Sequence, residues 1–108
     1  MVVRRQGLHE KAVKRFTKML RLSAAQMELR ILTKQMKLLT NLLGDYVSEV
    51  PKETWDQFSE ALRSQSDTIA DLIQSEEGPQ RKHNAQQAFA NLNEALREYF
   101  TPIREIAA

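Results

Sequence analysis

Basic side chains recur near the start of the chain, and they are the residues whose types and spacing best suit a binding reaction. Cationic groups three or four positions apart lie on one side of a helix. Such a charged face attracts phosphate groups of nucleic acids, anionic membrane surfaces or acidic proteins. The predicted contacts with an anionic partner are Arg4, Arg5, Lys11, Lys14, Arg15, Lys18 and Arg21.

Groupings typical of catalysis or metal binding are missing from the sequence. His9 and His83 lie far apart and lack the spacing of helical metal ligands. The absence of cysteine excludes disulfides and thiolate-bound metals. The three glycines are isolated, so no phosphate-cradling loop is expected. We therefore expect no enzyme activity, no catalytic or metal-binding residues, no cofactor and no small-molecule substrate.

Charge is divided unevenly along the sequence. Residues 1–40 hold ten basic and two acidic side chains, a net charge of +8, whereas residues 41–108 hold six basic and twelve acidic ones, a net charge of −6. The overall charge of +2 hides this division. An acidic partner, or the acidic part of a second copy, is a predicted binding partner of the basic segment.

The composition favours helices, which must position these charges. Apolar residues make up 42% and charged residues 28% of the 108 residues, and only three glycines and three prolines occur. The segment 8–22 is a basic amphipathic helix by its periodicity. In the segment 24–50, apolar residues recur at alternating spacings of three and four, which is typical of a packed coiled-coil-like seam. These patterns predict an all-α fold.

The apolar faces of these two segments point in nearly opposite directions. At about 100° per residue, the two patterns are out of phase on a continuous helix. Either the helix breaks near Ser23, or one long helix offers opposite faces to different partners. Ser23 and Gln26 fit a capping box, which favours the break.

The remaining sequence predicts two further helices, over 51–76 and 80–106. The helix 24–50 continues past Gly44 and ends before Pro51, which suits a first helical position. Polar residues 64–66 thin the middle of the third helix. Gly78 and Pro79 mark the clearest loop, and Pro102 predicts a kink in the last helix.

Short connections imply that consecutive helices run antiparallel. We expect an antiparallel three- to four-helix bundle with coiled-coil-like seams. Residues 23–108 supply three helices, and residues 1–22 form a basic amphipathic helix or arm that either packs on them as a fourth member or projects. The apolar surface exceeds what three helices need. The surplus predicts an interface containing Leu8, Phe16, Leu20, Ile31, Leu38, Leu42 and Phe100.

The leading functional hypothesis is a non-catalytic scaffold or adaptor, either self-associating or a subunit of a larger assembly. The alternatives are nucleic-acid binding or peripheral binding to anionic membranes through the basic segment. No apolar run is long enough to span a bilayer. An intracellular, most simply cytoplasmic, location is expected, with mitochondrial targeting as the alternative because the first residues are rich in arginine.

Overall fold

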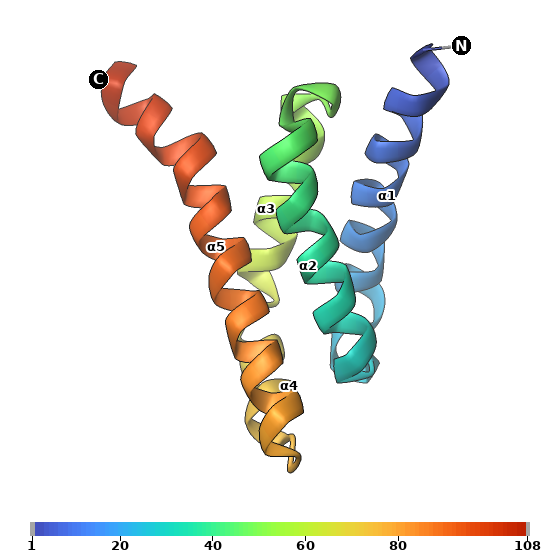
Figure 1. Cartoon of the computed structure of the whole chain (residues 1–108), viewed down its shortest axis with the longest axis vertical. Helices are drawn as coiled ribbons and strands as arrows, with labels where there is room; N and C mark the ends of the chain where they lie inside the picture. The colour runs from blue at the N-terminus through green and yellow to red at the C-terminus, as the bar shows by residue number, and fades with distance from the viewer. Residues whose placement is uncertain (1, 108) are drawn as a thin grey trace.

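The described residues form five α-helices joined by short turns and contain no strand. Their arrangement is shown in Figure 1. This computed structural model describes the backbone of residues 2–107 and the side chains of residues 7–99. The helices are α1 (Val2–Ser23), α2 (Leu29–Tyr46), α3 (Lys52–Ser64), α4 (Ser66–Ser75) and α5 (Pro79–Ala107). The all-α fold predicted from composition and periodicity is confirmed.

The helix breaks at Ser23, which is the first of the two alternatives that the phase reversal left open. A 3-10 helix (Ala24–Gln26) follows α1, and the extended residues Met27 and Glu28 lead into α2. The predicted capping box is wrong. The Ser23 hydroxyl bonds back to the Met19 carbonyl at 3.3 Å, so it closes the last turn of α1 and caps no later helix.

The turn between α2 and α3 is held by the single tryptophan of the chain. Helix α2 passes Gly44 and ends at Tyr46, and a 3-10 helix (Val47–Glu49) follows. Val50 is extended, the conformation favoured before proline, and Pro51 precedes the first residue of α3. Trp55 Nε1 donates a hydrogen bond to the Val47 carbonyl at 3.0 Å. This bond ties α3 to the turn before it.

The predicted helix 51–76 is two helices. It is interrupted at Gln65, whose backbone leaves the helical region with φ −102° and ψ 8°. The interruption falls within the polar stretch 64–66, where there is little apolar surface to hold a continuous helix against the core. Ser66 Oγ donates to the Arg63 carbonyl at 2.9 Å across the junction. One helix is therefore replaced by α3 and α4.

Helix α5 begins at Pro79, directly after the predicted loop. The Gly78 N–H donates to Glu76 Oε2 at 2.9 Å, and Arg81 Nε lies 3.3 Å from the same oxygen. Helix α5 continues past Pro102 and ends at Ala107. The loop and the last helix are confirmed.

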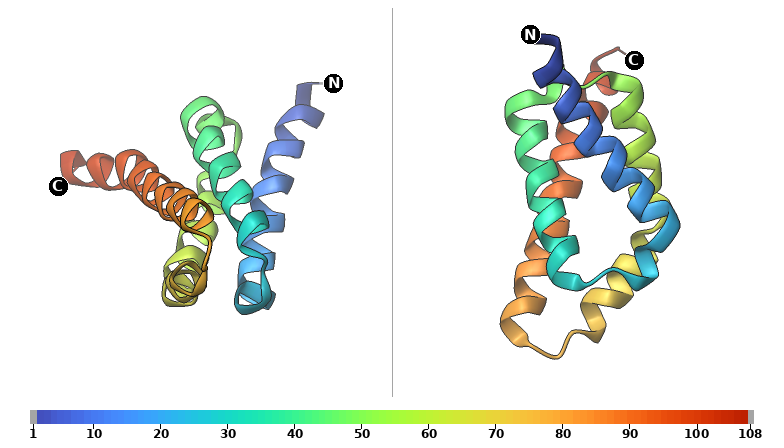
Figure 2. Two further views of the ribbon diagram at one scale, coloured as in Figure 1. Left: turned by 60° about the horizontal axis from the view of Figure 1, so that its bottom comes forward. Right: turned by 90° about the vertical axis from the view of Figure 1, so that its right-hand side faces the viewer.

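Helix packing pairs segments that are not consecutive in the sequence. The main contacts join α1 to α3 and α2 to α5, and the contacts of α1 with α2 are fewer. Helix α2 runs opposite to α1 and α3, and α5 runs opposite to α4, whereas α4 continues in the direction of α3. Each of these packed pairs therefore runs in the same direction (Figures 1 and 2). The molecule is flattened, with extents of 42 × 37 × 23 Å. Packing between sequence neighbours, which short connections suggested, is thus not the principal packing.

One apolar core collects the faces of all five helices. The break at Ser23 lets α1 and α2 turn their opposite apolar faces inward, so Val13 and Phe16 join the same core as Leu32 and Leu39. The rings of Phe16 and Phe58 lie 5.8 Å apart between their centroids, across the α1–α3 contact. Helix α1 therefore packs on α3, and most of the apparent surplus of apolar surface is buried within the chain.

Candidate functional site

The predicted basic residues lie on exposed positions of α1 wherever their side chains are described. Lys11, Lys14, Arg15, Lys18 and Arg21 are all exposed, while Val13 and Phe16 between them are buried. Helix periodicity explains this, because positions 13, 16 and 20 face the core and leave the intervening residues outside. The side chains of Arg4 and Arg5 lie outside the described residues.

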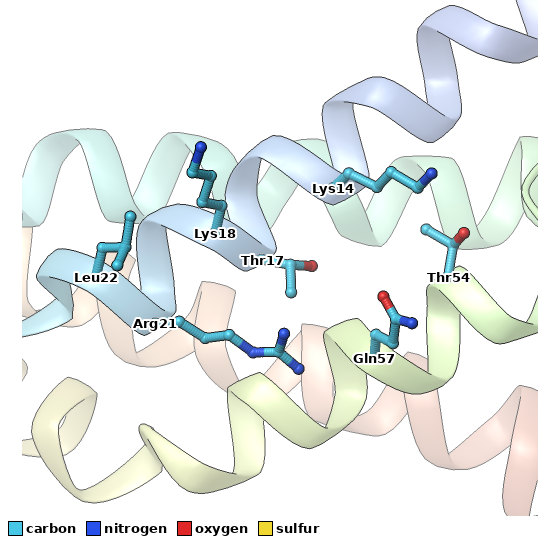
Figure 3. Close-up of a pocket in the computed structure, with 7 residues that line it drawn as sticks. All are labelled: Lys14, Thr17, Lys18, Arg21, Leu22, Thr54 and Gln57. Atoms are coloured by element: carbon cyan, nitrogen blue, oxygen red, sulfur yellow. The ribbon is translucent and has the colours of Figure 1, made fainter.

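One flank of α1 meets α3 and forms a cavity of about 250 Å³ (Figure 3). Helix α1 contributes three basic side chains, and α3 contributes a hydroxyl and an amide. The lining residues are Lys14, Thr17, Lys18, Arg21, Leu22, Thr54 and Gln57. The structure thus brings three of the predicted basic residues together with polar groups from a distant part of the sequence.

Few of these basic side chains are neutralised by carboxylates. Lys14 Nζ lies 3.3 Å from Glu10 Oε2, and on α2 Arg30 lies 3.7 Å from Glu28. Among the side chains that the structure describes, the other basic residues of α1 and α2 form no ion pair. Their positive charge is therefore open to a ligand.

The division of charge along the sequence becomes a division between helices. Residues 7–46, which include most of α1 and all of α2, carry eight basic and three acidic side chains. Residues 47–99 carry five basic and ten acidic ones. Helices α1 and α2 thus form a positive half of the molecule, and the negative charge is concentrated on α3, α4 and the loop before α5.

The exposed apolar residues lie on the same positive half. The large apolar side chains that are exposed among the described residues are Leu8, Leu22, Ile31, Leu38 and Tyr46, all on α1 or α2. Leu8, Arg15 and Leu22 are seven residues apart and share one face of α1, and Ile31 and Leu38 have the same relation on α2. We call the exposed residues Leu8, Arg15 and Leu22 of α1, together with Ile31, Lys34 and Leu38 of α2, the α1–α2 face.

The interface residues predicted from the sequence divide into two groups. Leu8, Ile31 and Leu38 are exposed, with Leu8 retaining 62% of its accessible surface. Phe16, Leu20 and Leu42 instead belong to the core, because the break at Ser23 turns both apolar faces inward. These three offer no surface to a partner. The side chain of Phe100 lies outside the described residues.

Several residues of the candidate site were missed by the sequence interpretation. The spacing of Leu22 from Leu8 and Arg15 was a usable signal, since it repeats every seven positions. Thr54 and Gln57 gave no signal, because only the packing of α3 against α1 brings them near the basic residues.

His9 takes part in a contact between helix ends. Its ring lies 4.4 Å from the Tyr46 ring between centroids, and Nδ1 lies 3.4 Å from Glu49 Oε1. Over the described residues, no group of three or more His, Cys, Asp or Glu side chains is arranged to hold a metal ion. None of the described helices is both long and apolar enough to cross a bilayer.

No protein-family model, curated protein or solved structure matches this chain. Function is therefore argued from the residues of the α1–α2 face and of the α1–α3 cavity.

Proposed function

We propose that this chain is a non-catalytic helical-bundle adaptor that binds an acidic partner protein through its α1–α2 face. The observation that carries the proposal is the coincidence of two properties on the same helices. The exposed large apolar side chains of the described residues and the excess of positive charge both lie on α1 and α2.

An acidic amphipathic helix is the partner whose chemistry fits this face. Leu8, Leu22, Ile31 and Leu38 offer apolar contacts along two helices, and the apolar face of an amphipathic helix is a partner surface that would cover them. Arg15 and Lys34 are exposed on the same two helices and would attract carboxylates at the edges of the contact. Apolar contacts then give affinity, and charge gives orientation and rate of encounter.

A second copy of the chain fits this face less well. The negative half carries exposed carboxylates on α3 and α4, but its described side chains include no exposed large apolar residue. The negative half of a second copy would offer charge opposite to that of the α1–α2 face, but it would leave the leucines of that face uncovered. A separate acidic protein is therefore the occupant that we propose.

The experiment is affinity capture from cells of the source organism, with the full chain as bait and four matched variants. Leu38→Asp and Arg15→Glu alter the α1–α2 face at exposed positions, so the core is left intact. Two control variants match these changes at exposed positions elsewhere. Arg63→Glu on α3 makes the same charge change as Arg15→Glu, and Gln74→Asp on α4 introduces the same acidic group as Leu38→Asp. A partner of the adaptor is retained by the two control variants and lost with the two α1–α2 variants.

Salt and vesicles separate the competing interpretations. We expect capture of an acidic protein to weaken as salt rises, because part of the attraction is electrostatic. Capture that is equal for all variants contradicts the proposal. Flotation with phosphatidylserine vesicles that needs Leu38 and Arg15 would make the ligand a membrane, and nuclease-sensitive capture would make it a nucleic acid.

A further inference from the structure

We propose that the cavity between α1 and α3 is a binding site for a phosphoryl group, either inorganic phosphate or the monoester of a small soluble molecule. The site lies on the flank of α1 that meets α3. It shares Leu22 with the α1–α2 face, but the two proposals are tested at different residues, Arg21 and Gln57 here and Arg15 and Leu38 there.

Uncompensated positive charge is the first argument. Lys14, Lys18 and Arg21 line the cavity, and no carboxylate does. Only Lys14 has an ion-pair partner, Glu10 at 3.3 Å, among the side chains that the structure describes. Lys18 and Arg21 form no ion pair with a described side chain, so an anion bound beside Arg21 is attracted by charge that no carboxylate offsets.

The hydrogen-bond donors of the cavity give the second argument. The Thr17 hydroxyl already donates to the Val13 carbonyl at 2.8 Å, and the Thr54 hydroxyl donates to Glu10 at 3.0 Å. Their protons are therefore not available to a ligand. The remaining donors are Lys18, Arg21 and the Gln57 amide, together with Lys14, which is shared with Glu10.

Geometry places two of these donors in the same space. The Arg21 guanidinium extends from α1 toward α3, and the Gln57 side chain rises from α3 with its amide oxygen nearer α1 and its nitrogen on the side of Thr54 (Figure 3). A half-turn of the terminal amide exchanges these two atoms and turns the nitrogen toward an anion beside Arg21. The Lys14 ammonium lies on the side of Thr54, whereas the Lys18 side chain points outward at the rim. Arginine presents a planar fork of donors that matches two phosphate oxygens, so Arg21 is the principal ligand and Lys14 and Lys18 supply charge.

The volume limits the size of the ligand. A cavity of about 250 Å³ is smaller than the roughly 300–1,000 Å³ of ordinary small-molecule sites. It accommodates a phosphoryl group with some water and excludes a large organic ligand from full burial. Inorganic phosphate and a small ester such as glycerol 3-phosphate share the chemistry that the donors recognise.

The test is a titration of the full chain with inorganic phosphate, followed by NMR of the Arg21 Nε–H and Gln57 side-chain amide resonances. A parallel titration with glycerol 3-phosphate distinguishes the two sources of the phosphoryl group, and sodium chloride at matched ionic strength controls for screening. We expect saturable shifts at both groups with the phosphate ligands. Tighter binding of the ester identifies a small phosphate ester as the ligand, and equal or weaker binding identifies phosphate itself.

Three variants assign the effect to the cavity. Arg21→Gln is expected to weaken binding at least about tenfold, since it removes the fork and its charge. Gln57→Ala is expected to weaken it severalfold without changing net charge. Lys37→Gln, an exposed lysine on α2, is the matched control and should leave binding within about twofold.

Specific outcomes overturn the proposal. Shifts that sodium chloride reproduces, shifts that do not saturate, or an equal loss in the Lys37→Gln control would show ordinary counterion attraction. Circular dichroism checks that each variant is folded. If Arg21→Gln fails that check, Gln57→Ala decides: unchanged binding by that variant rejects the site.

Discussion

The Thr54 hydroxyl donates a hydrogen bond to Glu10 Oε2 over 3.0 Å and thereby joins α3 to α1. Thr54 is buried, and the same carboxylate oxygen lies 3.3 Å from Lys14 Nζ. A buried hydroxyl, a half-buried carboxylate and an exposed ammonium thus form a polar connection at the edge of an apolar contact. This polar connection fixes the rotation of α1 relative to α3, because hydrogen bonds are directional whereas contacts between apolar side chains are not.

Thr54→Val tests this connection. Valine has nearly the same shape but cannot donate, so we expect a loss of about 1–2 kcal/mol in the free energy of unfolding, measured by urea denaturation. Thr33→Val is the matched control. The Thr33 hydroxyl bonds only to the Leu29 carbonyl within α2, so its replacement should cost less than about 0.5 kcal/mol. Equal effects of the two substitutions would show that the contact between helices adds nothing.

Leu39→Ala and Leu38→Ala compare adjacent leucines with opposite surroundings. Leu39 is fully buried on α2, whereas Leu38 is exposed on the α1–α2 face. We expect Leu39→Ala to reduce the free energy of unfolding by about 2–5 kcal/mol and Leu38→Ala by less than about 0.5 kcal/mol. Chemical denaturation followed by circular dichroism measures both. A large loss for Leu38→Ala would mean that its side chain is buried in solution.

Trp55→Phe removes the donor that holds the turn before α3. Trp55 is almost fully buried, and its indole N–H satisfies the Val47 carbonyl at 3.0 Å. Phenylalanine leaves that carbonyl unpaired and fills less volume, so a loss of about 1–3 kcal/mol is expected. Thermal unfolding of the variant, monitored by circular dichroism, gives the value. Tyr46→Phe nearby, which removes a hydroxyl from an exposed residue, should leave stability nearly unchanged.

Because of Glu76, we expect the free energy of unfolding to depend slightly on pH in the acid range. The Gly78 backbone N–H, helped by Arg81, holds the pKa of the Glu76 carboxyl below its ordinary value of 4.5. Since the folded-state pKa is depressed, the stabilisation is present above the unfolded pKa and is lost as pH falls through the folded pKa. The difference in unfolding free energy between the wild type and Glu76→Gln should therefore be constant from pH 7 to about 5 and shrink below pH 4.5. A difference that grows on acidification contradicts this assignment, and NMR titration of the carboxyl provides an independent check.

The sequence was informative about which residues face inward and where turns interrupt them. The phase reversal pointed to residue 23 as the place of a break or of a change of partner, and Gly78 with Pro79 located the start of α5. It misassigned the junction at Gln65, because polar residues 64–66 are compatible with a helix and only weakly oppose it. Helix ends set by side chains were also misjudged, since Ser23 bonds backward and does not cap.

Which helix packs against which could not be predicted from the sequence. An apolar stripe specifies that one face is buried, but not against which helix, and the packing of α1 with α3 depends on the fit of many side chains at once. For this reason the exposed basic residues of α1 were recognised from their spacing, whereas Thr54 and Gln57 were not. For the same reason Phe16, Leu20 and Leu42 were predicted to lie in an interface with a partner, whereas they lie in the core.

Packing between helices that are not consecutive also sets the order in which the protein can form during translation. Phe16 is synthesised 42 residues before Phe58, whose ring it meets. At about 5–20 residues per second, ribosomal synthesis leaves roughly 2–8 s between them. Helix α2 likewise has no principal partner until α5 is made. In the nascent chain α1 can therefore be covered as soon as α3 is made, whereas the apolar face of α2 stays uncovered until α5 emerges, which makes α5 decisive for whether the chain folds or aggregates.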